Sequence, residues 1–139
     1  MGASLSMAIN TTRDELERIS GAIEELGQQD DWPDDLVFRV NLVLEELILN
    51  IMDYGQDGED PDISLEIESE DNSISIELSD RGRPFDPLTE APEPDLTASV
   101  GERRVGGLGV HLTKTLMDDV QYTHEGGRNR LSIVTRKVR

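Results

Sequence analysis

The stretch that decides the fold is N-L-V-L-E-E-L-I-L-N, residues 41–50. It is apolar enough for a protein core, yet it carries Glu46 and Asn50 about one helical turn apart. The apolar pattern continues on both sides, so a largely buried helix is predicted over about residues 32–54, ending at Gly55. The two polar residues therefore need an explanation that a plain core helix does not give.

Four polar residues of this predicted helix, Arg39, Glu46, Asn50 and Asp53, fall within an arc of roughly 60°, at about 100° per residue. Most of the remaining helix surface is aliphatic, so this polar stripe must face either water or a cavity. One interpretation is a solvent-facing stripe with an Arg39–Glu46 ion pair at the surface. The other is a stripe that lines a ligand cavity, and the pattern alone does not decide between them.

Length and composition limit the classes of function. The chain has 139 residues, which fits one domain over residues 1–139, and it has no cysteine for disulfides or thiolate chemistry. The formal net charge of −17 argues against nucleic-acid binding and is typical of a solvated surface or of a protein with a basic protein partner. Without a signal peptide or a long apolar run, a soluble cytoplasmic protein with no membrane association is expected.

The remaining elements follow from hydrophobic period and turn residues. The predicted order is strand, helix, helix, two strands, a long loop, helix and two strands. Consecutive hairpins predict a mostly antiparallel mixed sheet, and three helices on one face would make an α/β (α+β) two-layer sandwich. The first helix should be capped by Thr11 or Thr12. In sequence order the elements are residues 4–10, 12–27, 32–54, 63–67, 74–78, the loop at about 86–105, 106–118, and two strands around Gly126-Gly127.

Asp80 is a second anomaly. Ile74, Ile76 and Leu78 share one face of a predicted strand, and Asp80 has the same parity, so alternation turns its carboxylate toward the core. A buried carboxylate needs hydrogen-bond donors, and a ligand amino group could supply one. The alternative is that the strand ends at Ser79 and Asp80 only begins a turn.

A third feature is R-V-G-G-L-G-V-H-L-T-K, residues 104–114, in which three glycines precede a predicted helix. Glycines at a helix start let a bulky anion approach backbone N–H groups, where the helix dipole favours negative charge. A plain connection between a loop and a helix would give the same pattern. The preceding loop is long for so small a domain, which favours a functional lid over a loop that only connects two elements.

Taken in order, E-x-x-x-N on a buried helix, D-R-G-R-P-F after a strand and G-G-L-G at a helix start resemble the Bergerat-type ATP-binding fold of gyrase, Hsp90, histidine kinases and MutL. The chain is more closely similar to the anti-sigma-factor serine/threonine kinases of bacterial partner switching, over about residues 4–138. Its departures from that pattern are Tyr54 in place of a histidine and G-R-N-R-L, residues 127–131, in place of a Gly-Thr pair.

This resemblance implies roles for the anomalous residues. Asn50 would hold Mg²⁺ at the nucleotide phosphates, Glu46 would be the general base or orienting group for the attacking hydroxyl, and Asp80 would accept from the adenine amino group. The implied nucleotide-binding residues are Asn50, Asp53, Asp80, Gly82, Pro84, Phe85, Gly106, Gly107, Leu108, Gly109 and Val110.

The implied function is that of a Mg-ATP-dependent kinase that phosphorylates a small antagonist protein on Ser or Thr and sequesters a sigma factor or similar regulator. The resemblance also implies a homodimer formed through the sheet. An alternative is a nucleotide-sensing interaction module without useful phosphotransfer, in which ATP only sets the conformation of the lid.

Overall fold

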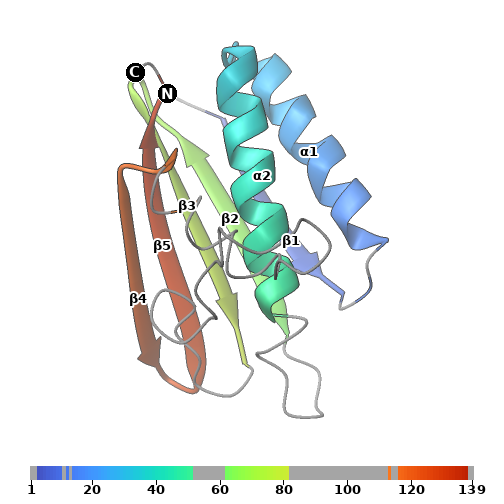
Figure 1. The fold of residues 1–139 in the computed structure, drawn as a ribbon, viewed down its shortest axis with the longest axis vertical. Helices are drawn as coiled ribbons and strands as arrows, with labels where there is room; N and C mark the ends of the chain where they lie inside the picture. Colours follow the sequence, from blue (N-terminus) through green and yellow to red (C-terminus); the bar gives the residue numbers. More distant parts are fainter. Residues whose placement is uncertain are drawn as a thin grey trace, which may run out of the picture.

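The computed structural model describes residues 3–10, 12, 14–51, 62–81, 113 and 116–137. Within these residues two helices cover one face of a five-stranded sheet, which confirms the predicted two-layer α/β sandwich (Figure 1). Neither helix has the length and apolarity that crossing a membrane requires. The elements are β1 Ser4–Ile9, α1 Glu15–Gln29, α2 Asp34–Asn50, β2 Ile63–Ser69, β3 Ser73–Asp80, β4 Asp119–Glu125 and β5 Arg128–Arg136.

The sheet has the strand order β1-β2-β3-β5-β4, and each described pairing is antiparallel. The expectation of a mixed sheet is therefore wrong for the described residues. The reason is the position of β5: it is antiparallel to both β3 and β4, so these two strands share a direction but do not pair. The β4–β5 hairpin turns at Gly126 and Gly127, whose φ values of 62° and 79° favour glycine.

Three predicted segments lie largely or wholly outside the described residues. The third helix is represented by Thr113 and Leu116, which are helical. Residues 52–54 at the end of the second predicted helix lie outside, as does the predicted lid at about residues 86–105.

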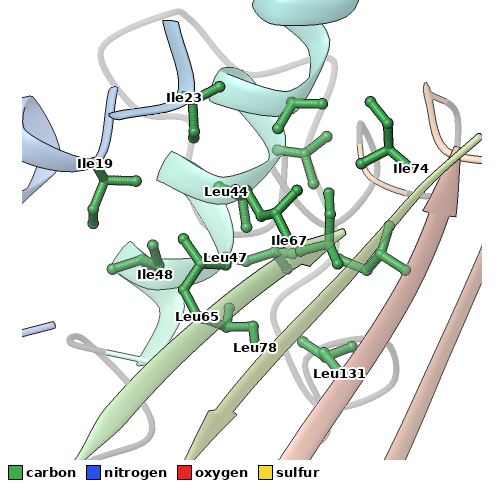
Figure 2. Packing of buried hydrophobic residues seen from close by; sticks show 14 of the residues in the cluster. Ile19, Ile23, Leu44, Leu47, Ile48, Leu65, Ile67, Ile74, Leu78 and Leu131 are labelled. Carbon is green, nitrogen blue, oxygen red and sulfur yellow. The ribbon is translucent and has the colours of Figure 1, made fainter. Parts of the chain in front are cut away.

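The core lies between α2 and the sheet. Alternate residues of β3 and β5 face the helices, so Ile76 lies opposite Ile133 and Leu78 lies opposite Leu131. Figure 2 shows Leu47 and Ile48 of α2 packed with side chains of the sheet in the same apolar cluster. Full burial of one such side chain contributes about 1.5–3 kcal/mol, so this contact holds α2 firmly in place.

The start of α1 differs from the prediction. Asp14 is the N-cap residue rather than Thr12, and it makes no side-chain capping bond; Thr11 lies outside the described residues. The carboxylate of Glu15 instead accepts hydrogen bonds from Arg18 Nε at 2.6 Å and from the Asn10 backbone N–H at 2.9 Å. These bonds, with Arg18 as the larger contributor, lower the pKa of Glu15 to about 2. A side chain in the first turn thus joins β1 to α1.

The connection between the helices is tied to the sheet through Asp30. Its Oδ2 atom accepts hydrogen bonds from Ser69 Oγ, from Trp32 Nε1 at 2.8 Å and from Lys137 Nζ at 3.0 Å. The bond from Ser69 contributes most to holding the pKa of this carboxyl below its ordinary value. The end of α1 is therefore fixed relative to β2 and the segment after β5.

Gly27 allows the close approach of α1 to the start of α2, and it supplies a stability test. A Cβ atom at this position would lie 2.8 Å from Val37 Cγ2, whereas a Cβ at Gly21 would meet nothing within 4 Å. We expect Gly27→Ala to destabilise the protein by about 1–3 kcal/mol through overpacking. Gly21→Ala, also within α1, should stabilise it by about 0.5–1 kcal/mol. Thermal or urea unfolding of both variants measures the difference, and an unfolding midpoint unchanged in Gly27→Ala would contradict the packing argument.

Candidate functional site

Arg39 fixes how α2 lies across the sheet. The residue is only 7% exposed, and Nη1 donates to Thr135 Oγ1 at 2.9 Å and to the Leu116 carbonyl at 3.5 Å. Nη2 donates to the Arg136 carbonyl at 3.5 Å, and Nε lies 3.6 Å from Asp35 Oδ2. The interpretation of a surface Arg39–Glu46 pair is therefore wrong, because Arg39 is directed to the last residues of β5.

This anchor determines which end of the sheet lies beneath the last turn of α2. From Arg39 to Asn50 the helix advances about 16 Å, at about 1.5 Å per residue. From Thr135 back to Asn129, β5 covers about 20 Å, at about 3.3 Å per residue. The helix and the strand run in opposite directions (Figure 1), so Asn50 lies toward the end of the sheet where Asp80 and Asn129 pair. The fold thus brings two of the predicted site regions to the same end of the molecule.

Glu46 lies half-buried on the fourth turn of α2. Its Oε2 atom is buried and has no hydrogen-bond donor among the described residues. Burial, and secondarily the negative charge of Glu45, raises the pKa of Glu46 from 4.5 to about 7. A carboxylate with this pKa can take a proton from a hydroxyl near neutral pH and is a candidate general base.

Asn50, the last residue of α2, is 1% exposed. Its amide carbonyl is the hard oxygen donor that Mg²⁺ prefers, and Mg²⁺ bound by proteins usually takes further ligands from phosphates and water. No group of three or more His, Asp or Glu side chains that could hold a metal occurs among the residues that the structure describes. One amide oxygen suits a magnesium ion that takes its other ligands from nucleotide phosphates and water.

Asp80 is the last residue of β3, and its side chain is 5% exposed. The strand runs through this position, so the alternative in which it ends at Ser79 is wrong and the parity argument holds. Asn129 lies directly opposite on β5, and its Nδ2 atom donates to Asp80 Oδ1 at 3.0 Å. The carboxylate is thus held on the helix-covered side of the sheet beside an amide.

Asn129 and Tyr122 were not predicted as site residues. Asn129 is 5% exposed, and its Oδ1 atom accepts a hydrogen bond from the Tyr122 hydroxyl. A sequence signal exists, because Asn129 has the same strand parity as Leu131 and Ile133 and is therefore a polar residue on an apolar face. It is the argument that identified Asp80, applied to the last strand.

The profile of the histidine kinase-like ATPase domain family matches residues 9–135, which is most of the chain. This chain belongs to that family. The predicted resemblance to this ATP-binding superfamily is thus confirmed.

Curated relatives of this ATPase domain include protein kinases. It is 27% identical over 114 residues to serine/threonine-protein kinase BtrW of Bordetella bronchiseptica, covering 81% of this chain and 80% of BtrW. It is 33% identical over 93 residues to serine-protein kinase RsbW of Listeria innocua, covering 63% of this chain and 59% of RsbW. An anti-sigma F factor of a Thermoanaerobacter species is 23% identical over 99 residues, covering 71% of this chain and 68% of that protein. The predicted anti-sigma kinase resemblance is confirmed.

Solved structures show the same fold. The RsbU and RsbW domains of a Mycobacterium tuberculosis protein match with a TM-score of 0.68 and 12% identity, over 96% of this chain and 32% of that one. At this identity the likeness supports the fold alone.

Several predicted site residues of the ATPase domain lie outside the described residues, and their nucleotide-binding roles stay predictions. With them lies the glycine-rich segment that would contact phosphate. They are Asp53, Gly82, Pro84, Phe85, Gly106, Gly107, Leu108, Gly109 and Val110.

A separate groove of about 860 Å³ lies between the end of α1 and the start of α2. It is lined by the exposed residues Glu24, Asp31 and Asp34 and by Phe38, which is 65% exposed. The groove involves the first half of α2, whereas Glu46 and Asn50 occupy its second half. It is therefore distinct from the candidate nucleotide site.

Proposed function

We propose that this chain binds Mg-ATP, transfers the γ-phosphoryl group to a Ser or Thr of a small antagonist protein, and sequesters a sigma factor or similar regulator. The observation that carries this proposal is Glu46: a half-buried carboxylate with a pKa of about 7, one turn before a buried asparagine on the same helix. A structural glutamate would normally be solvated or paired, and Oε2 has no donor among the described residues.

The transfer step assigns Glu46 as general base. The hydroxyl oxygen of the antagonist forms a bond to the γ-phosphorus, the bond from that phosphorus to the β,γ-bridging oxygen breaks, and ADP leaves with the electron pair. The hydroxyl proton passes to Glu46. Asn50 would hold Mg²⁺ through its side-chain oxygen, and the ion would supply charge neutralisation at the phosphates when bound.

Asp80 would recognise the adenine base of ATP. A carboxylate accepts hydrogen bonds but does not donate them when ionised, which suits an exocyclic amino group and rejects a carbonyl at the same place. One oxygen of this carboxylate accepts a hydrogen bond from the side-chain amide of Asn129.

The partners are proposed from the relatives and from the charge. Relatives named as serine or serine/threonine protein kinases and as an anti-sigma F factor support an antagonist and a sigma factor as partners. The net charge of −17 favours contacts with basic protein surfaces. Because the proposed reaction uses ATP, we infer that it takes place in the cytoplasm. The homodimer implied by the resemblance can be tested by sedimentation of the purified chain.

Two measurements test the proposed function. Mg-ATP should raise the melting temperature of the purified chain, because a ligand that binds only the folded state stabilises it. Radiolabel should pass from γ-labelled ATP to a Ser or Thr of an antagonist protein encoded near its gene. An ATP-dependent rise without any transfer would favour the nucleotide-sensing module, and no rise would overturn both functions.

The raised pKa of Glu46 predicts a pH dependence. The base must be ionised, so the transfer rate should rise with pH, with a midpoint near the pKa of about 7, and level off above it. The free energy of unfolding should fall as pH rises, because burying the ionised carboxylate destabilises the fold. This destabilisation is absent below the unfolded-state pKa of about 4.5 and complete above the folded-state pKa of about 7. Rates under single-turnover conditions and melts from pH 5 to about 8.5 check both trends. A flat rate profile would contradict the assignment of Glu46 as base.

A further inference from the structure

Three polar side chains from three neighbouring strands form one hydrogen-bonded series. Tyr122 of β4 donates its hydroxyl proton to Asn129 Oδ1, and Asn129 Nδ2 of β5 donates to Asp80 Oδ1 of β3 at 3.0 Å. Asp80 and Asn129 are each 5% exposed, while Tyr122 is partly buried against the core. The series runs across the sheet from the edge strand to the carboxylate proposed to recognise adenine.

The direction of these bonds is determined by chemistry. An ionised carboxylate only accepts hydrogen bonds, so the amide of Asn129 must turn its NH₂ group toward Asp80. The amide carbonyl then faces Tyr122, whose hydroxyl must act as the donor. If the hydroxyl group of Tyr122 is removed, the amide of Asn129 loses one of the contacts that hold it in this orientation.

The register explains why the three side chains meet. Asp80 lies directly opposite Asn129, and Tyr122 lies opposite Leu131, two residues along β5 from Asn129. Residues two apart on a strand share a face, and a diagonal neighbour is within reach of a long aromatic side chain. The antiparallel insertion of β5 between β3 and β4 therefore builds this contact.

We propose that Tyr122 and Asn129 are positioning residues that orient the Asp80 carboxylate and so set selectivity for a 6-aminopurine nucleotide. This inference rests on the proposed function, in which Asp80 accepts from the adenine amino group. Asn129 holds one carboxylate oxygen, which fixes the plane of the carboxyl group and hence the direction in which the other oxygen points. Tyr122 acts through Asn129 and does not itself touch the nucleotide.

The test compares dissociation constants of purified variants for Mg-ATP and for Mg-ITP, which carries an oxygen in place of the 6-amino group. The wild type should bind ATP more tightly than ITP. Tyr122→Phe keeps the ring but removes the hydroxyl, and it should weaken ATP binding by about 5-fold, the equivalent of one ordinary hydrogen bond. ITP binding should not change, so the dissociation constant for ITP divided by that for ATP becomes smaller.

Two further variants separate positioning from structure. Thr123→Val removes a hydroxyl from the neighbouring exposed residue of β4 and should leave both constants as in the wild type. Asn129→Leu should shrink the ratio at least as much as Tyr122→Phe does, and Asn129→Thr, which keeps a donor, should restore part of it.

The outcomes distinguish this inference from the proposed function. An unchanged ratio in folded Tyr122→Phe and Asn129→Leu, or equal weakening of both nucleotides, would overturn the positioning role while nucleotide binding stands. Wild-type protein that binds ATP no better than ITP would instead refute the role of Asp80 in the proposed function, and the positioning role with it.

Discussion

Replacing Glu46 with glutamine should lower the rate of phosphotransfer by about 100- to 10,000-fold, the range expected for loss of a general base. The amide has nearly the same shape as the carboxyl group but cannot take the hydroxyl proton. Because the side chain is half-buried and its raised pKa shows that ionisation costs free energy, the neutral amide should not destabilise the fold. Mg-ATP binding, followed by thermal shift or calorimetry, should stay close to that of the wild type.

Glu45→Gln is the matched control for this experiment. Glu45 is exposed and lies about 100° from Glu46 around the helix, so it does not share the polar stripe. Its replacement removes the same charge from the adjacent position and should leave the transfer rate within about 2-fold of the wild type, apart from a small fall in the pKa of Glu46. A Glu46→Gln protein that transfers phosphate as fast as Glu45→Gln would eliminate Glu46 as the base.

Much of the architecture follows from local patterns. Strand alternation predicted that Asp80 points to the core, and helical period predicted that Glu46 and Asn50 lie on one side of α2, which the burial of these residues supports. The capping prediction at Thr12 failed because α1 begins later, with Asp14 as its N-cap, and Glu15 in the first turn accepts a bond from the Asn10 backbone N–H before the helix. Patterns of this kind predict the direction of a side chain but not which group lies opposite it.

Arg39 and Asn129 show where that limit lies. The helical wheel put Arg39 on the stripe of Glu46, but its partners are distant in sequence: Thr135 belongs to β5, and Leu116 precedes β4. The hairpin at Gly126-Gly127 is short enough to predict that β4 and β5 pair. The contact of Asn129 with Asp80 additionally requires β5 to insert beside β3, which no local pattern specifies.

Asp80→Asn should weaken Mg-ATP binding by about 10- to 100-fold, the loss expected for a buried hydrogen bond to a charged acceptor. The NH₂ group of Asn129 donates toward this position, so the carbonyl of the new amide should turn to accept that bond. Its own NH₂ group would then point where the carboxylate oxygen did and would meet the adenine amino group, donor against donor. ITP presents an acceptor at the same place, so its affinity should rise while that of ATP falls.

The change in preference from ATP to ITP separates base recognition from a change in charge. Asp119→Asn removes one negative charge at an exposed position of β4 and serves as the control. Because the chain carries a net charge of −17, removing any carboxylate slightly favours a polyanionic nucleotide, so general electrostatics predicts tighter binding of both nucleotides. Weaker ATP binding together with stronger ITP binding therefore cannot come from charge alone. If Asp80→Asn changed both affinities in the same direction as Asp119→Asn, Asp80 would not be the residue that recognises the base.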